Sequence, residues 1–242
     1  MPRPWLALLL ALLLPLVLGA ETSRDLGVAS YAEMQGEARV ALVVGNGAYS
    51  SGPLRNPPSD ARAMAAELRE LGFDVTLKTD LGYQDMRRAV VDFSNALQAG
   101  GVGLFFYAGH GLQHQGRNFL VPVDATIQGE SYIAVESVDV ANVLAGMNEA
   151  HNRLNIVILD ACRNNPFERS FRSASGGLAV TDAPRGTLIA YATGPGKTAE
   201  DGSGGHSSYT AALLENMGRP GAKVEDVFKQ VRVAVENDTG GR

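Results

Sequence analysis

Two residues whose types combine in nucleophilic catalysis each follow a run of apolar residues. His110 stands between two glycines, just after the apolar run 102–107. Cys162 is the single cysteine of the 242 residues and follows the apolar run 154–159. A thiolate is a strong nucleophile, and an imidazole beside it can lower the pKa of the thiol or take its proton during attack. This combination of side chains suits acyl transfer.

β-Strands are the elements that must position these two side chains. The runs 102–107 and 154–159 have the length and composition of buried strands. In open parallel sheets, functional groups gather at the carboxyl ends of the strands, and neighbouring strands lie about 5 Å apart. We therefore predict a catalytic dyad of Cys162 and His110. The backbone N–H groups of Gly111 and Cys162 are the candidate donors of its oxyanion hole.

Apolar runs alternate with segments of helical periodicity along most of the chain. Parallel strands with continuous apolar sequence need helices on both faces of their sheet. The pattern predicts an α/β fold, a three-layer α/β/α sandwich with a mainly parallel central sheet. Residues 119–123 are expected to form a small hairpin, and the polar residues 163–185 a mobile loop. The expected strands are 40–44, 73–77, 102–107, 154–159 and 187–192, and the expected helices are 61–71, 83–97, 138–147, 207–217 and 224–235.

The first 20 residues have the pattern of a signal peptide, with a basic start at Arg3 and an apolar run over 5–18. The run of about 14 residues is short for a bilayer span, which needs about 20. We expect residues 1–20 to be a leader, 21–38 a polar linker and 39–242 the folded domain. The protein is then exported, periplasmic or secreted, although an uncleaved anchor stays open as an alternative.

Composition excludes several classes of protein. One cysteine permits no intrachain disulfide, so the lone thiol of an exported protein is either a buried apolar residue or a reactive group. The formal net charge is −5 and the sequence has no run of lysine or arginine. Nucleic acid is therefore not an expected partner, and no membrane contact is expected once the leader is removed.

Several short sequence motifs surround the candidate residues along the chain. They are Val43-Val44-Gly45-Asn46 with Tyr49, Leu54 with Asp60-Ala61, Phe106-Tyr107-Ala108-Gly109-His110-Gly111, Asp160-Ala161-Cys162, Leu188-Ile189-Ala190-Tyr191-Ala192-Thr193 with Pro195-Gly196, and Ser208-Tyr209-Thr210. Together they resemble the caspase-like cysteine peptidase superfamily, and most closely the metacaspases and bacterial caspase-like proteins. The resemblance implies that 39–242 is a caspase-like peptidase domain and that His110 and Cys162 are catalytic.

The resemblance also implies a preference for basic residues. Caspases place cationic and amide side chains around the pocket that holds an aspartate, whereas metacaspases and paracaspases place acids there. This sequence has Asp160 two residues before the cysteine, Asp60 at the start of the first helix, and Asp201 where caspases keep an arginine. Acids converging on one pocket attract arginine or lysine and repel aspartate, although each could also be an ordinary cap or surface residue. We therefore expect a cysteine endopeptidase that cleaves proteins or peptides after Arg or Lys.

Self-cleavage and oligomeric state are further questions that the family raises. The loop 163–185 corresponds to the region between the two subunits of caspases, and it contains Arg169, Arg172 and Arg185. An enzyme that cleaves after arginine could process itself there, but exposed loops often carry arginine for no such reason. Caspases dimerise through a last strand, for which this chain has no apolar run after 224–235. Dimerisation is left open.

No metal site or cofactor is predicted as a requirement. His110 and His114 are four residues apart, but the surrounding glycines disfavour a helix and no third zinc ligand is evident. Several metacaspases depend on calcium, so calcium activation is left open. The available oxygen ligands have no EF-hand spacing and define no site. They are Asp124, Glu130, Glu136 and Asp139.

Two other functions remain as alternatives to an endopeptidase. A catalytically idle caspase-like module would bind partners without cleaving them. A thiol amidase would use the same Cys–His pair but would not need the acidic pocket.

Overall fold

The computed structural model describes residues 36–162, 178–192 and 204–240. By its internal contacts the chain divides into residues 1–36 and 37–242, and every element described here lies in the second unit. Within this unit, the described strands form a seven-stranded sheet whose parallel part has the order β2-β1-β3-β6-β7. These parallel strands are β1 (Arg39–Gly45), β2 (Asp74–Thr79), β3 (Val102–His114), β6 (Leu154–Cys162) and β7 (Thr187–Tyr191).

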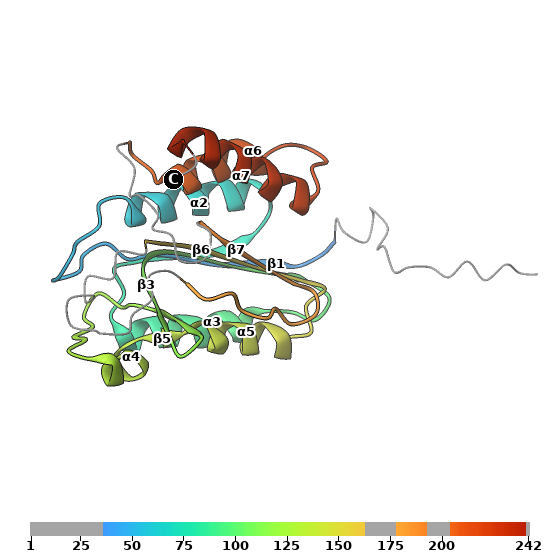
Figure 1. Cartoon of the computed structure of the whole chain (residues 1–242). Coiled ribbons are helices and arrows are strands. Elements are labelled where there is room, and N and C mark those ends of the chain that lie inside the picture. The colour runs from blue at the N-terminus through green and yellow to red at the C-terminus, as the bar shows by residue number, and fades with distance from the viewer. Residues whose placement is uncertain (1–35, 163–177, 193–203, 241–242) are drawn as a thin grey trace, which may run out of the picture. The chain divides into compact units, whose positions relative to one another are not determined.

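Helices cover both faces of the parallel strands, which confirms the predicted three-layer α/β/α sandwich (Figure 1). One face carries α2, α6 and α7, and the other carries α3 and α5. Neighbouring residues of a strand point to opposite faces, so Val43 packs in the cluster that contains Met64 of α2, whereas Val44 packs with Met86 of α3. The helices are α2 (Pro57–Glu70), α3 (Tyr83–Ala96), α4 (Glu130–Glu136), α5 (Val140–Glu149), α6 (Ser208–Met217) and α7 (Val224–Thr239).

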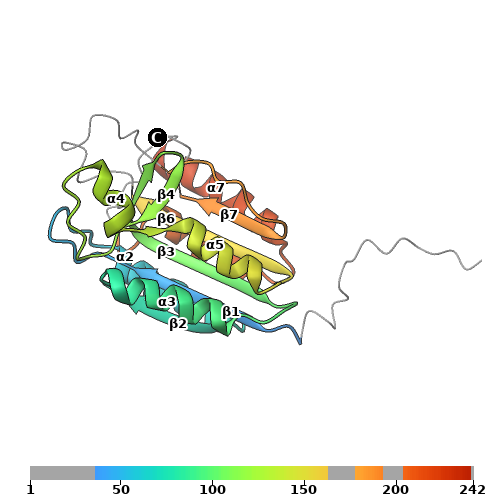
Figure 2. The ribbon, with the colours of Figure 1, turned by 90° about the horizontal axis from the view of Figure 1, so that it is seen from below.

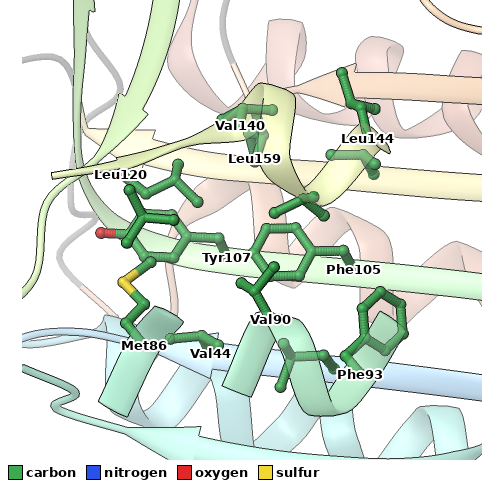
Figure 3. Close-up of a cluster of buried hydrophobic side chains, with 14 of the residues drawn as sticks. Val44, Met86, Val90, Phe93, Phe105, Tyr107, Leu120, Val140, Leu144 and Leu159 are labelled. Carbon is green, nitrogen blue, oxygen red and sulfur yellow. The ribbon is translucent and has the colours of Figure 1, made fainter. Parts of the chain in front are cut away.

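The core between the sheet, α3 and α5 is built from large side chains that are fully buried. Phe105 and Tyr107 of β3 lie at its centre with no exposed surface, between Phe93 of α3 and Leu144 of α5 (Figure 3). Burial of each side chain of this size stabilises the fold by about 1.5–3 kcal/mol. The core therefore holds β3 firmly at the position from which it delivers the candidate histidine.

β3 is longer than the sequence pattern indicates. The apolar run ends at Tyr107, but the strand continues to His114 and pairs antiparallel with β4 (Arg117–Leu120), which pairs in turn with β5 (Val138–Asp139) (Figure 2). The hairpin thus begins before the predicted residues 119–123. The turn residues Gln115 and Gly116 have φ values of 50° and 76°, which suits the tight turn of a two-residue hairpin.

The other differences from the predicted elements are local. Two residues of the predicted helix 138–147 form β5, and the helix α5 begins only at Val140, where the side chain of Asp139 accepts the N–H of Ala141 at 2.8 Å. α4 was not predicted, because its seven residues are too few to show a helical pattern. In the described parts of the chain, no helix is long and apolar enough to cross a bilayer. The predicted leader lies outside the described residues.

Candidate active site

The sheet brings the two residues of the predicted dyad to the same end of neighbouring strands. β3 and β6 run parallel, and the last pair in their register is His110 opposite Cys162. Neighbouring strands lie about 4.8 Å apart, so the two backbones are direct neighbours at this point. The structure describes the backbone of Cys162 but not the surroundings of its side chain. Gly111 follows His110 in β3, opposite Leu120 of β4.

The ring of His110 is held by a backbone carbonyl that sequence reasoning did not identify. His110 is 3% exposed, and its Nε2 lies 2.6 Å from the carbonyl oxygen of Gly52. Because a carbonyl oxygen can only accept, Nε2 must carry the proton. In the neutral imidazole, Nδ1 is then the nitrogen that can take up a proton, so the contact with Gly52 assigns the basic atom of the ring.

Two buried tyrosines fix the backbone of His110. Its N–H donates to the Tyr49 hydroxyl at 2.9 Å, and its carbonyl accepts from the Tyr107 hydroxyl at 2.9 Å. The rings of Tyr49 and His110 also pack together, with centroids 4.4 Å apart. Gly109 has a φ of 153°, and a Cβ on it would lie 2.6 Å from the Tyr49 hydroxyl. The glycine before the histidine is therefore required by the close approach of the tyrosines.

The segment that carries Tyr49 and Gly52 is tied to the sheet at its start. Asn46 is fully buried, and its side chain accepts from the N–H of Leu81 at 2.9 Å and donates to the carbonyl of Val121 at 3.3 Å. The carboxylate of Asp80 accepts from the N–H groups of residues 47 and 48 at 2.8 and 2.9 Å. These bonds connect the segment to the loop after β2, so Tyr49 and Gly52 are held in place beside His110.

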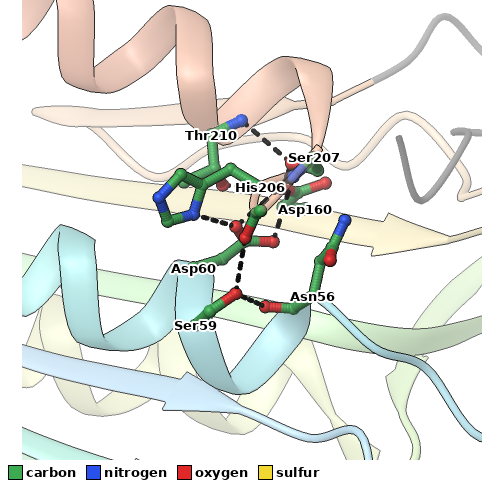
Figure 4. A network of polar contacts seen from close by, with 8 residues as sticks. Asn56, Ser59, Asp60, Asp160, His206, Ser207 and Thr210 are labelled. Carbon is green, nitrogen blue, oxygen red and sulfur yellow. Dashed lines mark hydrogen bonds and ion pairs between the residues drawn. The ribbon is translucent and has the colours of Figure 1, made fainter. Parts of the chain in front are cut away.

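Two of the three predicted pocket acids come together beneath α6 (Figure 4). Asp60 lies in the first turn of α2, and Asp160 lies in β6 two residues before Cys162. Asp60 is 1% exposed and Asp160 is 3% exposed. The third acid, Asp201, lies outside the described residues.

The segment before α6 supplies the hydrogen-bond partners of both acids. Nδ1 of His206 lies 2.8 Å from Oδ1 of Asp60, and the N–H of Ser207 lies 3.3 Å from the same oxygen. The hydroxyls of Ser207 and Thr210 both donate to Oδ2 of Asp160, the latter at 2.7 Å. Sequence reasoning identified the two acids but gave no role in the site to His206, Ser207 or Thr210, although Thr210 belongs to one of the quoted motifs, because nothing in their spacing relates them to α2 or β6. We call these five residues the acid cluster.

The surroundings of Asp60 change its ionisation. Burial, and then the negative charge of Asp160, raise the pKa of Asp60 to about 7, while hydrogen bonds from His206 and Ser207 act in the opposite direction. Burial and the charge of Asp160 also raise the pKa of Tyr209 in α6. Two carboxylates that share a buried site repel each other, so a positively charged group is favoured beside the acid cluster.

The described part of the predicted mobile loop 163–185 is anchored to β4. The buried side chain of Asn118 accepts from the N–H of Ala179 at 2.7 Å and donates to its carbonyl at 2.8 Å. Leu178 is 3% exposed and packs in the core beside Gly111. Residues 178–181 are therefore held beside the candidate site. Arg185 is exposed, whereas Arg169 and Arg172 lie outside the described residues.

Two of the acids considered as calcium ligands already have structural partners. Asp139 caps α5 and forms an ion pair with Arg117. Asp124 accepts from the N–H of Tyr83 at the start of α3, at 2.8 Å. Within the ranges that the structure describes, no group of three His, Cys, Asp or Glu residues has an arrangement that could hold a metal ion.

The sequence was compared with protein families and with known proteins. A family model described as "Caspase domain" matches residues 38–242. The chain belongs to the caspase domain family. This caspase domain is also 40% identical over 126 residues to mucosa-associated lymphoid tissue lymphoma translocation protein 1 from Homo sapiens, and 39% identical over 126 residues to its homolog from Mus musculus. Each match covers 52% of this chain and 15% of the relative, so the chain spans only a small part of these relatives.

Proposed function

We propose that this caspase domain is a cysteine endopeptidase that cleaves peptide bonds after arginine or lysine. Membership of the caspase domain family supports the peptidase activity. The observation that carries the specificity is the convergence of Asp60 and Asp160 in one buried cluster, with Asp160 two residues before the nucleophile. A guanidinium or ammonium group entering this cluster would be attracted by the negative charge of the two carboxylates.

The proposed reaction uses Cys162 as the nucleophile and His110 as the base and then the acid. Nδ1 of His110 takes the thiol proton while Nε2 donates to Gly52. The sulfur attacks the carbonyl carbon, and the C–N bond breaks as the imidazolium gives its proton to the leaving amine. Water then hydrolyses the thioester, giving one proton back through His110 to the thiolate. The N–H groups of Gly111 and Cys162 are the proposed oxyanion donors.

Hydrolysis of short fluorogenic peptides tests this proposal. Peptides that end in Arg, Lys or Asp before the reporter should be compared with wild type and Cys162→Ala, with and without calcium. We expect cleavage after Arg and Lys by wild type alone. Asp160→Asn, which keeps the size of the side chain, should raise the KM for Arg peptides more than it changes kcat. Cleavage after Asp alone would contradict the specificity.

The same proteins can be used to test self-cleavage and the alternative of an inactive binding module. N-terminal sequencing of purified protein, with Cys162→Ala as the control, would reveal self-cleavage after Arg169, Arg172 or Arg185. An intact chain in both samples would contradict self-processing. If wild type cleaves no peptide under any condition, a catalytically idle binding module becomes the better explanation.

A further inference from the structure

His206 is the ionisable side chain of the acid cluster for which the proposed reaction has no use. Its Nδ1 lies 2.8 Å from Oδ1 of Asp60 (Figure 4). The side chain of His206 is 36% exposed, whereas that of Asp60 is 2% exposed. The imidazole thus reaches from solvent to a carboxylate that is otherwise buried, and it occupies an oxygen that a substrate cation would need.

The groups around Asp60 act in opposite directions on its ionisation, and His206 favours the charged carboxylate. Asp160 of β6 repels the Asp60 carboxylate, while His206 and the N–H of Ser207 stabilise it. The charge of Asp160 also raises the pKa of Tyr209 of α6. Among these groups, His206 is the side chain that forms a hydrogen bond with the Asp60 carboxylate. A buried carboxylate beside a second acid is costly without hydrogen-bond donors, because burial removes the water that would otherwise stabilise it.

We propose that His206 is a specificity-determining residue, the resident hydrogen-bond partner of Asp60 that the arginine or lysine side chain of a substrate replaces. This inference rests on the proposed function and adds how the Asp60 carboxylate is stabilised before a substrate binds. The guanidinium takes the place of Nδ1 on Asp60, and the imidazole turns toward the solvent that it already contacts. Binding becomes an exchange of one hydrogen-bond donor to Asp60 for another. Without His206, a proton on Asp60 must be displaced instead.

The pH dependence of substrate binding follows from this exchange. His206 opposes the effects of burial and Asp160, so its removal raises the pKa of Asp60 above the value of about 7 that it has beside the histidine. Asp60 is then protonated over more of the neutral range in the variant. The KM for an Arg peptide therefore rises more steeply in the variant than in wild type as the pH falls from about 8 to about 6.

Steady-state kinetics between these pH values test the proposal. KM and kcat for an Arg peptide are measured for wild type, His206→Ala and His206→Gln, with His114→Ala as a control histidine outside the acid cluster. We expect His206→Ala to raise KM about threefold to tenfold at the acidic end, since one pKa unit corresponds to about tenfold, and to leave kcat unchanged. Gln, which can donate a hydrogen bond without charge, should lie between Ala and wild type. The His114→Ala control should follow wild type.

Two outcomes would overturn the role of His206. One is that wild type and His206→Ala have the same KM at every pH. The other is a loss of kcat that is the same at every pH and accompanies a lower melting temperature, because that result describes a purely structural residue.

Carbon-13 NMR of the aspartate carboxyl groups separates this proposal from the proposed function, because it needs no activity. The Asp60 signal is assigned with Asp60→Asn, and its titration is followed in wild type and His206→Ala, with and without methylguanidinium. We expect a higher midpoint in His206→Ala and a lower one with methylguanidinium in both proteins. Equal midpoints in the two proteins would overturn the role of His206, even if the enzyme cleaves Arg peptides. If wild type cleaves nothing, a higher midpoint still supports His206 as the group that lowers the pKa of Asp60.

Discussion

His110 depends on partners that the chemistry of its own side chain does not reveal. Its Nε2 is held by the carbonyl of Gly52, and its main chain lies between the hydroxyls of Tyr49 and Tyr107. A backbone carbonyl can be supplied by any residue type, so no sequence pattern points to Gly52. The basic nitrogen of the histidine is thus assigned by a segment 58 residues away along the chain.

The Tyr49 hydroxyl should matter for both stability and turnover. Tyr49→Phe removes the acceptor for the buried N–H of His110, and an unsatisfied group of this kind costs about 1–3 kcal/mol. We expect a lower melting temperature and a lower kcat with little change in KM, because the backbone of His110 loses its partner while phenylalanine keeps the ring that packs on the histidine. Tyr132→Phe, on the exposed face of α4, is the matched control. Unchanged kcat and stability in Tyr49→Phe would show that the hydroxyl does not hold the histidine.

At the scale of elements, the extension of β3 past the parallel sheet shapes the site. The strand leaves its parallel partners at His110 and continues into the hairpin with β4. Asn118 of β4 then binds the main chain of Ala179. One hairpin therefore carries the candidate base and also holds residues 178–181 of the proposed cleavage loop.

Removing the anchor should loosen this segment selectively. Asn118→Ala leaves the N–H and carbonyl of Ala179 without their side-chain partner, which costs about 1–3 kcal/mol. We expect faster amide hydrogen exchange over residues 178–181, with little change in the parallel strands. Asn95→Ala, an exposed position in α3, serves as the control. Exchange at 178–181 that matches wild type would contradict the anchoring role.

At the scale of the whole molecule, the acid cluster joins elements that are distant in sequence. Asp60 lies on α2, Asp160 on β6 and Ser207 before α6, so the cluster joins two helices on one face of the sheet to a strand beneath them. Such a cluster opposes folding when its acids are charged and poorly compensated. Its ionisation should therefore appear in the pH dependence of global stability.

Asp60 should lower the stability of the folded protein as the pH rises. Its pKa is raised in the folded state to about 7 from the ordinary value of 3.8, so the folded protein holds a proton that the unfolded chain has lost. This contribution is present at low pH and is lost as the pH rises through about 7. The melting temperature of Asp60→Asn relative to wild type should therefore increase from pH 5 to pH 8. Asp74→Asn, on the exposed side of β2, should show no such trend, and a constant difference for Asp60→Asn would contradict the prediction.

The sequence by itself determined the elements and the reactive groups of this caspase domain. Apolar runs and helical periodicity predicted the sandwich, because strands and helices that bury one face must repeat at fixed spacings. The placement of His110 and Cys162 after two such runs predicted that they meet, and the register of β3 and β6 makes their backbones neighbours. Asp60 and Asp160 were identified through the resemblance to the caspase-like superfamily, and both lie in the acid cluster.

Only the tertiary structure decided which groups support these residues. Gly52, Tyr49, Asn118 and His206 act through contacts between segments that are far apart along the chain. Such contacts depend on the way loops return to the sheet, which has no periodicity that a sequence pattern could express. The chemistry of the site could thus be read from residue types. The location of the proton on His110 and the hydrogen-bond partner of Asp60 follow from tertiary contacts.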